Sequence, residues 1–583
     1  TRHHPLVGLL GFLFLSSTAA TALADNPIVQ TLYTADPAPM VYDGRVYLYT
    51  GHDEDTLVNG FYTMNDWRLY SSADMVNWTD HGSPLSYTSF TWASGDAWAG
   101  QVVERNGTFY YYVPITQRNG GKVLGVATAS SPLGPFTDAL GHPLVSTSGC
   151  IDPTVFIDDD GQAYLYWGNP DLWYVKLNAD MVSYQGSPTK VTLTTAGFGT
   201  RTGDPNRTTL YEEGPWFYKR GALYYMVYAA GGIPEYISYS TSSSPTGPWT
   251  YRGVIMPSQG KSFTNHPGVV DFQGNSYFFY HNGALPDGSG FHRSVAVEQF
   301  EYGNDGSFPT INMTSTGPAG VGHLDPYQRN EAETIAWGSG IETEPCSAGG
   351  MDVSFIENGD YIKVKGVDFG EGAVSFSASV ASETTGGTLE LRLDSESGAL
   401  VGSCAVTGTG GWQTWTTTTC AVSGAAGIHD LFLRFTGGGG YLFNFDWWQF
   451  TSVNGGSAGA GNAGGAGTGA AGGGAAGSGG SAGTSGVAGT AGVAGSGVGG
   501  TSPGVAGTSS AGQSGAGAPA FGGSAGTSPA ESSSSSSGCG CHVTPQGNSA
   551  AWWVGLMALG GLALRAAGRA KSASPRSRAE ARR

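Results

Sequence analysis

The chain has 583 residues, which leaves room for three or four structural units at about 150 residues per domain. Its 27 Lys and Arg face 45 Asp and Glu, a net charge of −18, and this sign is wrong for a protein that holds nucleic acid. Gly occurs 96 times and only 12% of residues are charged, so part of the chain is of low complexity. Aromatic residues make up 12%, which suits a sugar-handling surface and a β core equally well.

The N-terminus has the layout of an export signal. Basic and polar residues precede an apolar run over 6–15, and a stretch of small residues ends at Ala24, as in secretory signal peptides. The apolar run is shorter than the roughly 20 residues that a membrane span needs. We therefore expect residues 1–24 to be a signal peptide, with a permanent anchor as the alternative, and the protein to be exported.

The C-terminal part divides into a linker and a tail. Residues 452–538 consist almost entirely of Gly, Ala, Ser and Thr, a composition that predicts a disordered, flexible linker. Residues 539–583 contain a Cys-Gly-Cys-His sequence, an apolar segment over 550–564 that predicts a short hydrophobic helix, and a basic end. Two Cys and one His supply too few ligands for a closed zinc site.

This tail resembles the sorting tails of myxobacterial surface proteins. The resemblance implies that the tail sorts the protein or attaches it to the membrane or cell surface. Positive charge after an apolar segment places such a tail on the cytoplasmic side. Nearer the N-terminus, Cys404 and Cys420 flank one hairpin-like stretch, so they are expected to form a disulfide, while Cys150 and Cys346 stay free.

One pattern recurs five times within residues 25–318. A turn glycine is followed by a strand of aromatic and β-branched residues, and this happens at Gly44, Gly107, Gly161, Gly221 and Gly274. The spacing suits four-stranded units that carry loops. The sequence therefore predicts an all-β fold with a five-bladed β-propeller over 25–318. An ordinary β-sandwich would not explain the fivefold recurrence.

Three of the five units carry an acidic residue at the same position. Asp36, Asp152 and Glu213 lie eight or nine residues before the turn glycine, and the fifth unit has His266 there. In the second unit the position adjoins Trp98. Equal positions in the repeat lie on the same strand of each blade, and the innermost strands line the central channel. These side chains are therefore expected to converge.

Converging carboxyl groups fit the hydrolysis of a glycosidic bond. Crowded carboxylates repel, so one is held protonated, as a general acid must be, and another activates water or attacks the sugar. The alternative is that Asp-Pro and Glu-Gly-Pro only form turns, but three equivalent positions favour catalysis. Arg293 in the last unit is a candidate to bind a sugar, with a surface ion pair as the alternative.

Two acidic runs offer weaker sites. Residues 52–55 and 158–160 are rich in Asp and Glu, which are calcium ligands. The second run directly precedes a turn glycine, so a solvated hairpin loop is the favoured interpretation.

The catalytic stretches resemble glycoside hydrolase family 43, a five-bladed propeller family of inverting enzymes. The resemblance covers about 27–318 and rests on residues 35–40 (ADPAPM), 152–161 (DPTVFIDDDG) and 211–216 (YEEGPW). It implies that Asp36 is the general base and Glu213 the general acid. It also implies that Asp152 orients Glu213 and raises its pKa. Glu212 adjoins Glu213, but the repeat and the family pattern favour Glu213.

Three further stretches narrow this resemblance. Residues 98–101, 164–169 and 263–268 are most similar to the arabinoxylan arabinofuranohydrolases, which remove arabinofuranosyl branches from xylan. On this basis Trp98 and His266 are expected to bind substrate. A β-xylosidase or an arabinanase of the same family is the alternative, and no organic cofactor is expected.

A second unit is expected over 325–451. Short alternating strands such as 389–393 and 431–435 indicate a β-sandwich. The unit resembles carbohydrate-binding module family 6, which has a jelly-roll fold. The resemblance implies a structural Ca²⁺ and a sugar-binding cleft. The calcium ligands would be Glu331, Glu333 and Asp446, and the cleft would contain Tyr361, Trp412 and Asn444. The alternative for the two rings is a place in the core.

The sequence thus predicts an exported, monomeric glycoside hydrolase that acts on xylan or arabinoxylan, with no nucleic-acid partner. A catalytically silent polysaccharide-binding surface protein is the alternative from a different class. The complete set of three acids argues against that alternative.

Overall fold

The computed structural model describes residues 25–147 and 149–454. Almost all of its regular elements are strands, with one short helix, α1 (Thr195–Phe198), and one turn of 3₁₀ helix (Tyr87–Ser89). The predicted signal peptide, nearly all of the predicted linker and the whole predicted tail lie outside the described residues. Within the described ranges, no helix is long and apolar enough to cross a membrane.

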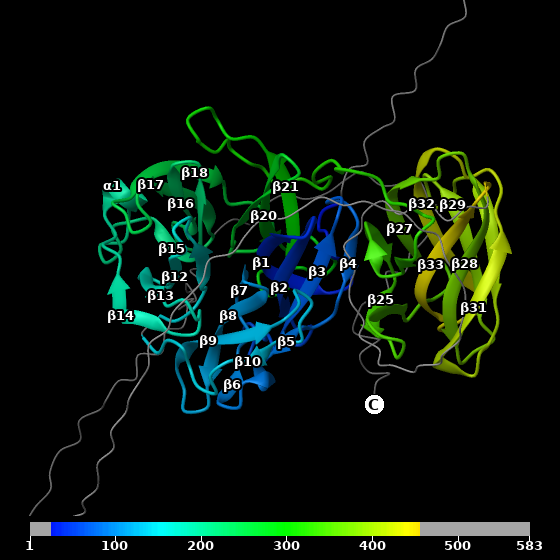
Figure 1. Ribbon diagram of the computed structural model, residues 1–583, viewed down its shortest axis with the longest axis horizontal. Helices are drawn as coiled ribbons and strands as arrows, with labels where there is room; N and C mark the ends of the chain where they lie inside the picture. The colour runs from blue at the N-terminus through cyan, green and yellow to red at the C-terminus, as the bar shows by residue number, and fades with distance from the viewer. Residues whose placement is uncertain (1–24, 148, 455–583) are drawn as a thin grey trace, which may run out of the picture. The chain divides into compact units, whose positions relative to one another are not determined.

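Residues 33–300 form five antiparallel sheets in chain order (Figure 1). The first contains β1 (Tyr33–Tyr42), β2 (Arg45–Asp53), β3 (Asp66–Ser72), β4 (Trp78–Asp80) and β5 (Leu85–Ser86), and β23 (Thr334–Ile335) pairs with β4. The second contains β6 (Ala93–Gly95), β7 (Gln101–Arg105), β8 (Thr108–Gln117), β9 (Lys122–Ala129) and β10 (Thr137–Asp138).

The other three sheets follow in the chain. The third contains β11 (Thr154–Ile157), β12 (Ala163–Trp167), β13 (Trp173–Leu177) and β14 (Tyr184–Lys190). The fourth contains β15 (Tyr211–Arg220), β16 (Leu223–Ala230), β17 (Tyr236–Ser242) and β18 (Thr250–Met256). The fifth contains β19 (Gly268–Phe272), β20 (Asn275–Asn282) and β21 (Ser294–Phe300).

Each repeated glycine occupies the same hairpin in its sheet. It joins β1 to β2, β7 to β8, β11 to β12, β15 to β16 and β19 to β20. All five glycines have φ between 59° and 82°, a left-handed conformation that glycine adopts without steric cost. The repeat in the sequence is therefore a repeat of hairpins.

The strands that precede these glycines contact one another in sequence order. β1 lies against β7 and β19, and β11 lies against β7 and β15. The indole N–H of Trp216 in β15 donates to the carbonyl of Val269 in β19 at 3.2 Å. These five strands therefore surround a common centre. The N–H of Ile28 donates to the carbonyl of Val295 at 3.0 Å, so the start of the described chain lies against β21.

Residues 330–452 form a β-sandwich of two antiparallel sheets. One has the strand order β25 (Glu342–Pro345), β26 (Met351–Ser354), β33 (Asn444–Ser452), β28 (Ala373–Ser382) and β31 (Gly411–Ala421), with β22 (Asn330–Glu331) on β33. The other has the order β24 (Trp337–Ser339), β27 (Tyr361–Asp368), β32 (Ile428–Gly437), β29 (Gly387–Leu393) and β30 (Leu400–Val406). Apolar side chains of both inner faces form one core.

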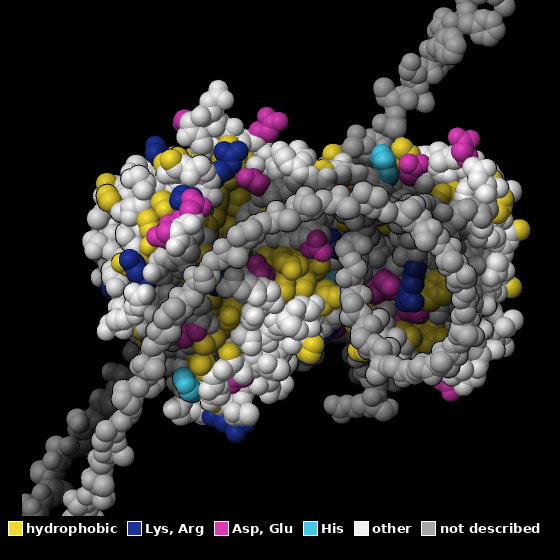
Figure 2. All heavy atoms as spheres, viewed as in Figure 1, with side chains coloured by type: hydrophobic (Ala, Val, Ile, Leu, Met, Phe, Trp, Pro, Cys, Tyr) yellow, Lys and Arg dark blue, Asp and Glu magenta, His cyan; other side chains and the backbone are white. Residues whose placement is uncertain are grey.

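The cysteine predictions are confirmed within the described residues. A disulfide joins Cys404 in β30 to Cys420 in β31 and so links the two sheets of the sandwich. Cys150 and Cys346 are free and buried. Charged side chains are sparse on the face seen in Figure 2, in keeping with their 12% share of the sequence.

Candidate active site

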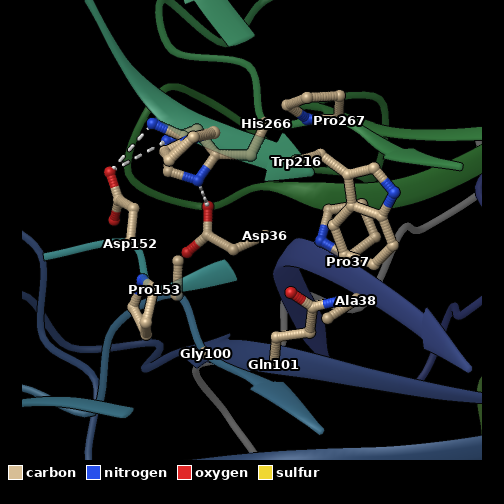
Figure 3. A pocket seen from close by; sticks show the side chains of 13 residues that line it. Asp36, Pro37, Ala38, Gly100, Gln101, Asp152, Pro153, Trp216, His266 and Pro267 are labelled. Carbon is tan, nitrogen blue, oxygen red and sulfur yellow. Dashed lines mark hydrogen bonds and ion pairs between the residues drawn. The ribbon is translucent and has the colours of Figure 1, made fainter. Parts of the chain in front are cut away.

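The structure brings together the four residues that share one position in the repeat. Asp36 lies in β1 and Glu213 in β15, while Asp152 and His266 lie two residues before the starts of β11 and β19. All four are less than 9% exposed. Figure 3 shows the imidazole of His266 between Asp36 and Asp152. The predicted convergence at the centre of the sheets is thus present in the structure.

Irregular backbone turns these carboxyl groups toward the centre. Asp36 and Asp152 have φ of 54° and 55°, a left-handed conformation that is uncommon outside glycine and often found at active sites. The pairing of β1 with β2 shifts register between Ala35 and Ala38, and that of β15 with β16 shifts on either side of Glu213. Bulges of this kind redirect single side chains.

His266 contacts all three carboxyl groups. Its Nδ1 lies 3.0 Å from Asp36 Oδ1, and its Nε2 lies 3.3 Å from Glu213 Oε1 and 4.0 Å from Asp152 Oδ2. Asp36 and Glu213 therefore lie at opposite nitrogens of one ring. Gly214 makes room for this ring, because a Cβ there would lie 2.8 Å from His266 Cδ2.

Glu213 has two further supports. The N–H of Gly214 donates to Asp152 Oδ2 at 3.1 Å, so Asp152 fixes the backbone next to Glu213. The side-chain amide of Asn169, which follows β12, donates to Glu213 Oε2. Glu213, the expected general acid, is thus held by Asn169 at its carboxyl group and by Asp152 at the neighbouring backbone.

Arg293 lies behind Asp36. Its Nη1 contacts Asp36 Oδ1 at 3.0 Å, and its Nε and Nη2 contact the two oxygens of Asp53 at 2.9 and 2.8 Å. The guanidinium also lies 4.5 Å from the ring centre of Tyr62. Arg293 is only 4% exposed, so the structure makes it the partner of Asp36, a role that the sequence interpretation did not assign.

Burial and neighbouring charges shift the pKa values of Asp36 and Asp152 in opposite directions. Burial raises the pKa of Asp36, but the positive charges of Arg293 and His266 outweigh it and lower that pKa below its ordinary value. Burial, together with the charges of Glu213 and Asp36, raises the pKa of Asp152 to about 7, against the opposing effect of His266. Asp36 is therefore an ionised carboxylate suited to accept a proton.

The pKa of Glu213 is lowered in this arrangement, whereas the family resemblance implied that Asp152 would raise it. Burial raises its pKa, but the hydrogen bond and charge of His266 and the amide of Asn169 outweigh burial and lower it. Burial disfavours the imidazolium of His266, yet Asp36 and Asp152 raise its pKa well above the ordinary value. The raised pKa among the three acids thus belongs to Asp152, because His266 lies nearer to Glu213.

A small cavity of about 30 Å³ adjoins these groups, lined by Asp36, Asp152, His266 and residues in or just before β1, β7, β11, β15 and β19 (Figure 3). A water molecule needs about 10–15 Å³ of space for its centre. The cavity can therefore hold water beside Asp36 and Asp152.

A group of half-buried rings lies beside the site. It consists of Phe61, Tyr62, Trp98, Phe263 and Phe291, whose neighbouring ring centres are 4.8–6.4 Å apart. We call this group the aromatic rim. Tyr62 connects it to Arg293, and the Tyr62 hydroxyl lies 3.3 Å from Thr264 Oγ1. Lys122 Nζ covers one face of the Trp98 ring at 3.2 Å, which leaves that ring only its other face and edges for a sugar.

The two acidic runs have separate structural roles. His52 Nδ1 contacts Asp66 Oδ1 at 2.8 Å, and Asp53 binds Arg293. Asp158 contacts Lys219 Nζ at 2.9 Å and accepts from the hydroxyl of Tyr224 at 2.6 Å, so 158–160 is a hairpin turn.

Two groups in the described residues bring possible metal-ligand atoms within 4.8 Å of one another. They are His52 with Glu54 and Asp66, and Asp152 with Glu213 and His266. The predicted calcium ligands of the sandwich do not form so tight a group in the described structure. His52 and Glu54 belong to the first acidic run of the sequence, and the second group consists of residues that share the repeated position.

The predicted calcium ligands nevertheless surround an unpaired oxygen. Glu333 Oε2 is buried and has no hydrogen-bond partner among the described residues. Burial, and then the charge of Glu331, raises the pKa of Glu333 well above its ordinary value. Arg329 lies 2.9 Å from Glu331 and 3.7 Å from Asp446. A buried, unpaired carboxylate oxygen among other acids fits the chemistry of a cation site.

The sandwich separates the predicted sugar-binding residues. Trp412 packs at 6.4 Å against Tyr441, which packs at 5.4 Å against Phe355. Asn444, buried at the start of β33, donates to Glu344 Oε1 at 2.8 Å. Tyr361 belongs to the other sheet, in β27, and contacts Phe432 at 5.8 Å.

The sequence interpretation missed several residues of both sites. Asp53, Asn169, Phe355 and Tyr441 were not assigned, although Asn169 lies in one of the stretches that carried the narrower resemblance. Phe355 directly follows β26 and has φ of 56°. A left-handed phenylalanine cannot be recognised from sequence alone.

The chain matches two families. Residues 24–308 match the model of glycosyl hydrolases family 43, and residues 331–452 match carbohydrate binding module family 6. The chain is 38% identical to the arabinoxylan arabinofuranohydrolase of Bacillus subtilis strain 168, over 76% of this chain and 96% of that protein. The chain belongs to glycosyl hydrolase family 43. It is therefore a glycoside hydrolase, and it carries a family 6 module.

Two further comparisons cover most of this family 43 chain. It is 37% identical to the arabinoxylan arabinofuranohydrolase of Paenibacillus polymyxa, over 74% of this chain and 75% of that protein. A crystal structure of the family 43 arabinoxylan arabinofuranohydrolase from Bacillus subtilis, in complex with cellotetraose, has a TM-score of 0.65 and 36% identity. It covers 74% of this chain and 99% of that one. The propeller-like fold of the catalytic domain is thus shared.

Proposed function

We propose that this family 43 protein removes α-L-arabinofuranosyl side chains from arabinoxylan by a single displacement with inversion. The observation that carries the mechanism is the placement of Asp36 and Glu213 at opposite nitrogens of His266. Inverting glycosidases keep their two carboxyl groups about 6.5–9.5 Å apart so that a water molecule fits. One imidazole ring and its two contacts, 3.0 and 3.3 Å long, lie between the two carboxyl groups, which supports a separation of this size.

Asp36 acts as the general base. Arg293 and His266 keep its carboxylate ionised, so it removes a proton from the attacking water. Glu213 acts as the general acid and protonates the leaving oxygen of the xylose unit. The water oxygen bonds to the anomeric carbon as the bond from that carbon to the leaving oxygen breaks. The base gains one proton and the acid loses one, and proton exchange with the solvent restores both before the next turnover.

Substrate binding must give Glu213 its proton. The contact between Glu213 and His266 lowers the pKa of Glu213 in the free enzyme. A sugar that enters between Glu213 and the imidazole of His266 weakens this contact. Burial is then the main influence on Glu213, and burial raises the pKa of a carboxyl group. Asp152 holds the backbone of Gly214, so it orients Glu213 during this change.

The five sheets of residues 33–300 support a five-bladed β-propeller, and the sandwich supports a jelly-roll. We assign the polymer backbone to the aromatic rim, since rings stack on sugar faces. The rings of Phe355, Trp412 and Tyr441, with Asn444 nearby, support a second sugar site on the module. Such a module raises the local concentration of polymer at the active site.

Four proposals concern the state of the whole protein. The signal-peptide pattern supports export, and the Cys-containing basic tail supports attachment to the membrane or cell surface through a short hydrophobic helix. We propose that the protein acts as a monomer. We also propose a structural Ca²⁺ at Glu331, Glu333 and Asp446, supported by the unpaired oxygen of Glu333.

The test is to incubate the purified protein with arabinoxylan and identify the sugar released, with Glu213→Ala alongside. Arabinose alone, lost in the variant, is the expected result. Xylose or xylo-oligosaccharides would assign a β-xylosidase instead. Arabinose from arabinan but not from arabinoxylan would assign an arabinanase, and polymer bound without release would assign a silent binding protein.

A further inference from the structure

A fourth buried carboxyl group lies beside the three catalytic acids. Glu235 directly precedes β17 and is 4% exposed. Its main-chain N–H donates to the carbonyl of Phe263 at 2.9 Å, and its Oε2 accepts from the main-chain N–H of Asn265 at 2.8 Å. One residue thus ties down both ends of segment 263–265, and the next residue in the chain is His266.

His281 in β20 holds the same segment from another side. Its main-chain N–H donates to Asn265 Oδ1 at 3.2 Å, and its Nε2 donates to the carbonyl of Thr264 at 2.9 Å. Its Nδ1 accepts from the N–H of Asp36 at 3.1 Å. The segment before His266 is therefore held from several sides, and Glu235 holds it through a carboxyl group.

The loop that carries Glu235 is closely packed. Gly231 and Gly232 have φ of 84° and 80°. A Cβ at 231 would lie 2.2 Å from the ring of Tyr236, and one at 232 would lie 2.1 Å from Arg201 Nη2. The loop cannot move toward these neighbours, so the place of the Glu235 side chain is set by its surroundings.

We infer that Glu235 is a positioning residue for His266: it holds segment 263–265 so that the imidazole reaches Asp36 and Glu213 at the same time. Loss of the carboxyl group leaves the buried N–H of Asn265 without a partner, which is costly. The segment then shifts, and the two contacts of the ring, 3.0 and 3.3 Å long, cannot both be kept. This role deepens the proposed function and uses the same site.

The first test compares substitutions of Glu235 in the full chain, with 4-nitrophenyl α-L-arabinofuranoside as substrate. Glu235→Ala is expected to lower kcat by about 30-fold with KM within about twofold, since misplacing catalytic groups by about 1 Å costs up to about 10²-fold. Glu235→Gln is expected to restore kcat to within about threefold, because its carbonyl oxygen still accepts from Asn265. A Gln variant as slow as the Ala variant would overturn the inference.

Glu298 provides the matched control. It is also a buried carboxyl group in this domain, 7% exposed, and it accepts from the main-chain N–H of Thr314 at 2.8 Å. Glu298→Ala is expected to lower the melting temperature but to leave kcat within about twofold, because it does not contact the segment before His266. A fall in kcat equal to that of Glu235→Ala would mean that any buried carboxyl group has this effect, and would overturn the inference.

A double-mutant cycle tests whether the effect passes through His266. In a His266→Ala background, Glu235→Ala is expected to lower kcat by less than about threefold, because coupled residues are not additive. The same 30-fold fall in both backgrounds would overturn the inference.

A crystal structure of Glu235→Ala supplies a readout apart from activity: the His266 ring is expected to move away from Asp36, and an unmoved ring would overturn the inference. If the unaltered protein releases no arabinose from arabinoxylan, the proposed function fails, and this crystal structure alone decides the inference.

Discussion

Asp53 binds Arg293 at three points. Its carboxylate accepts from the main-chain N–H and Nε of Arg293, both at 2.9 Å, and from Nη2 at 2.8 Å. The remaining Nη1 contacts Asp36 Oδ1 at 3.0 Å. Because Asp53 fixes the guanidinium, Asp36 has a constant positive neighbour. Asp53 and Arg293, which are far apart in sequence, thus help to keep the carboxylate of Asp36, the proposed base, ionised in a buried site.

The substitution Asp53→Asn tests this relationship through pH. The base must be ionised, so activity is lost as the pH falls through its pKa. A loosely held Arg293 stabilises the carboxylate less, so the pKa of Asp36 rises. The acid limb of kcat/KM is therefore expected to move to higher pH, with kcat/KM about tenfold lower at the acid end.

Asp66→Asn is the matched control for Asp53→Asn, because Asp66 pairs with His52 rather than with Arg293. Its acid limb is expected to stay in place. An unchanged acid limb in Asp53→Asn, measured from kcat/KM against pH, would contradict the role of Asp53.

Glu213→Ala tests the identity of the acid through the leaving group. General acid catalysis contributes about 10²–10⁴-fold, and a poor leaving group needs it most. The fall in kcat is therefore expected to be larger on arabinoxylan than on 4-nitrophenyl α-L-arabinofuranoside. Glu212→Gln serves as control: Glu212 pairs with Arg201 and Arg207, so its effect should be the same on both substrates. An equal loss on both substrates in Glu213→Ala would assign the acid to another residue.

The repeat in the sequence was enough to find the centre of the site. Asp36, Asp152, Glu213 and His266 share one position relative to the turn glycine, and equal positions in a repeat become equal positions in space. The pairing of Cys404 with Cys420 could likewise be predicted, because the two residues flank one local stretch.

The partners of these residues could not be predicted in the same way. Asp53, Asn169 and Glu235 lie outside the repeated position, and each reaches the site from a loop or strand end through contacts between different sheets. The contacts of Arg293 could not be predicted for the same reason. Its sequence made it a candidate to bind a sugar, whereas in the structure its guanidinium binds Asp53 and Asp36. The pKa of Glu213 depends on a distance of 3.3 Å to His266, which no sequence pattern encodes.

Calcium is expected to stabilise the sandwich. A cation at Glu331, Glu333 and Asp446 would pair the buried oxygen of Glu333 and offset the repulsion among the acids. Removal of Ca²⁺ by a chelator is therefore expected to lower the melting temperature, and added Ca²⁺ to restore it. Calorimetry of the protein and of Asp446→Asn measures this. A variant that responds to Ca²⁺ as the unaltered protein does would contradict the assignment.

Trp412→Ala is expected to weaken binding to insoluble arabinoxylan by about tenfold or more, since stacking on a ring accounts for much of sugar recognition. Hydrolysis of the small aryl glycoside should not change, because the ring lies in the sandwich. Tyr361→Ala is the control, since Tyr361 lies in the other sheet against Phe432. Pull-down with polymer measures both variants, and equal losses would contradict the proposed cleft of Phe355, Trp412 and Tyr441.

The most direct test follows the anomeric form of the first sugar released from arabinoxylan, by proton NMR within the first turnovers. Water that Asp36 activates attacks the face opposite the leaving group, which Glu213 protonates. The account predicts arabinose as the only sugar, with the β-anomer appearing first and the α-anomer only later through mutarotation. Release of the α-anomer first would show retention and contradict the assignment of Asp36 as a base.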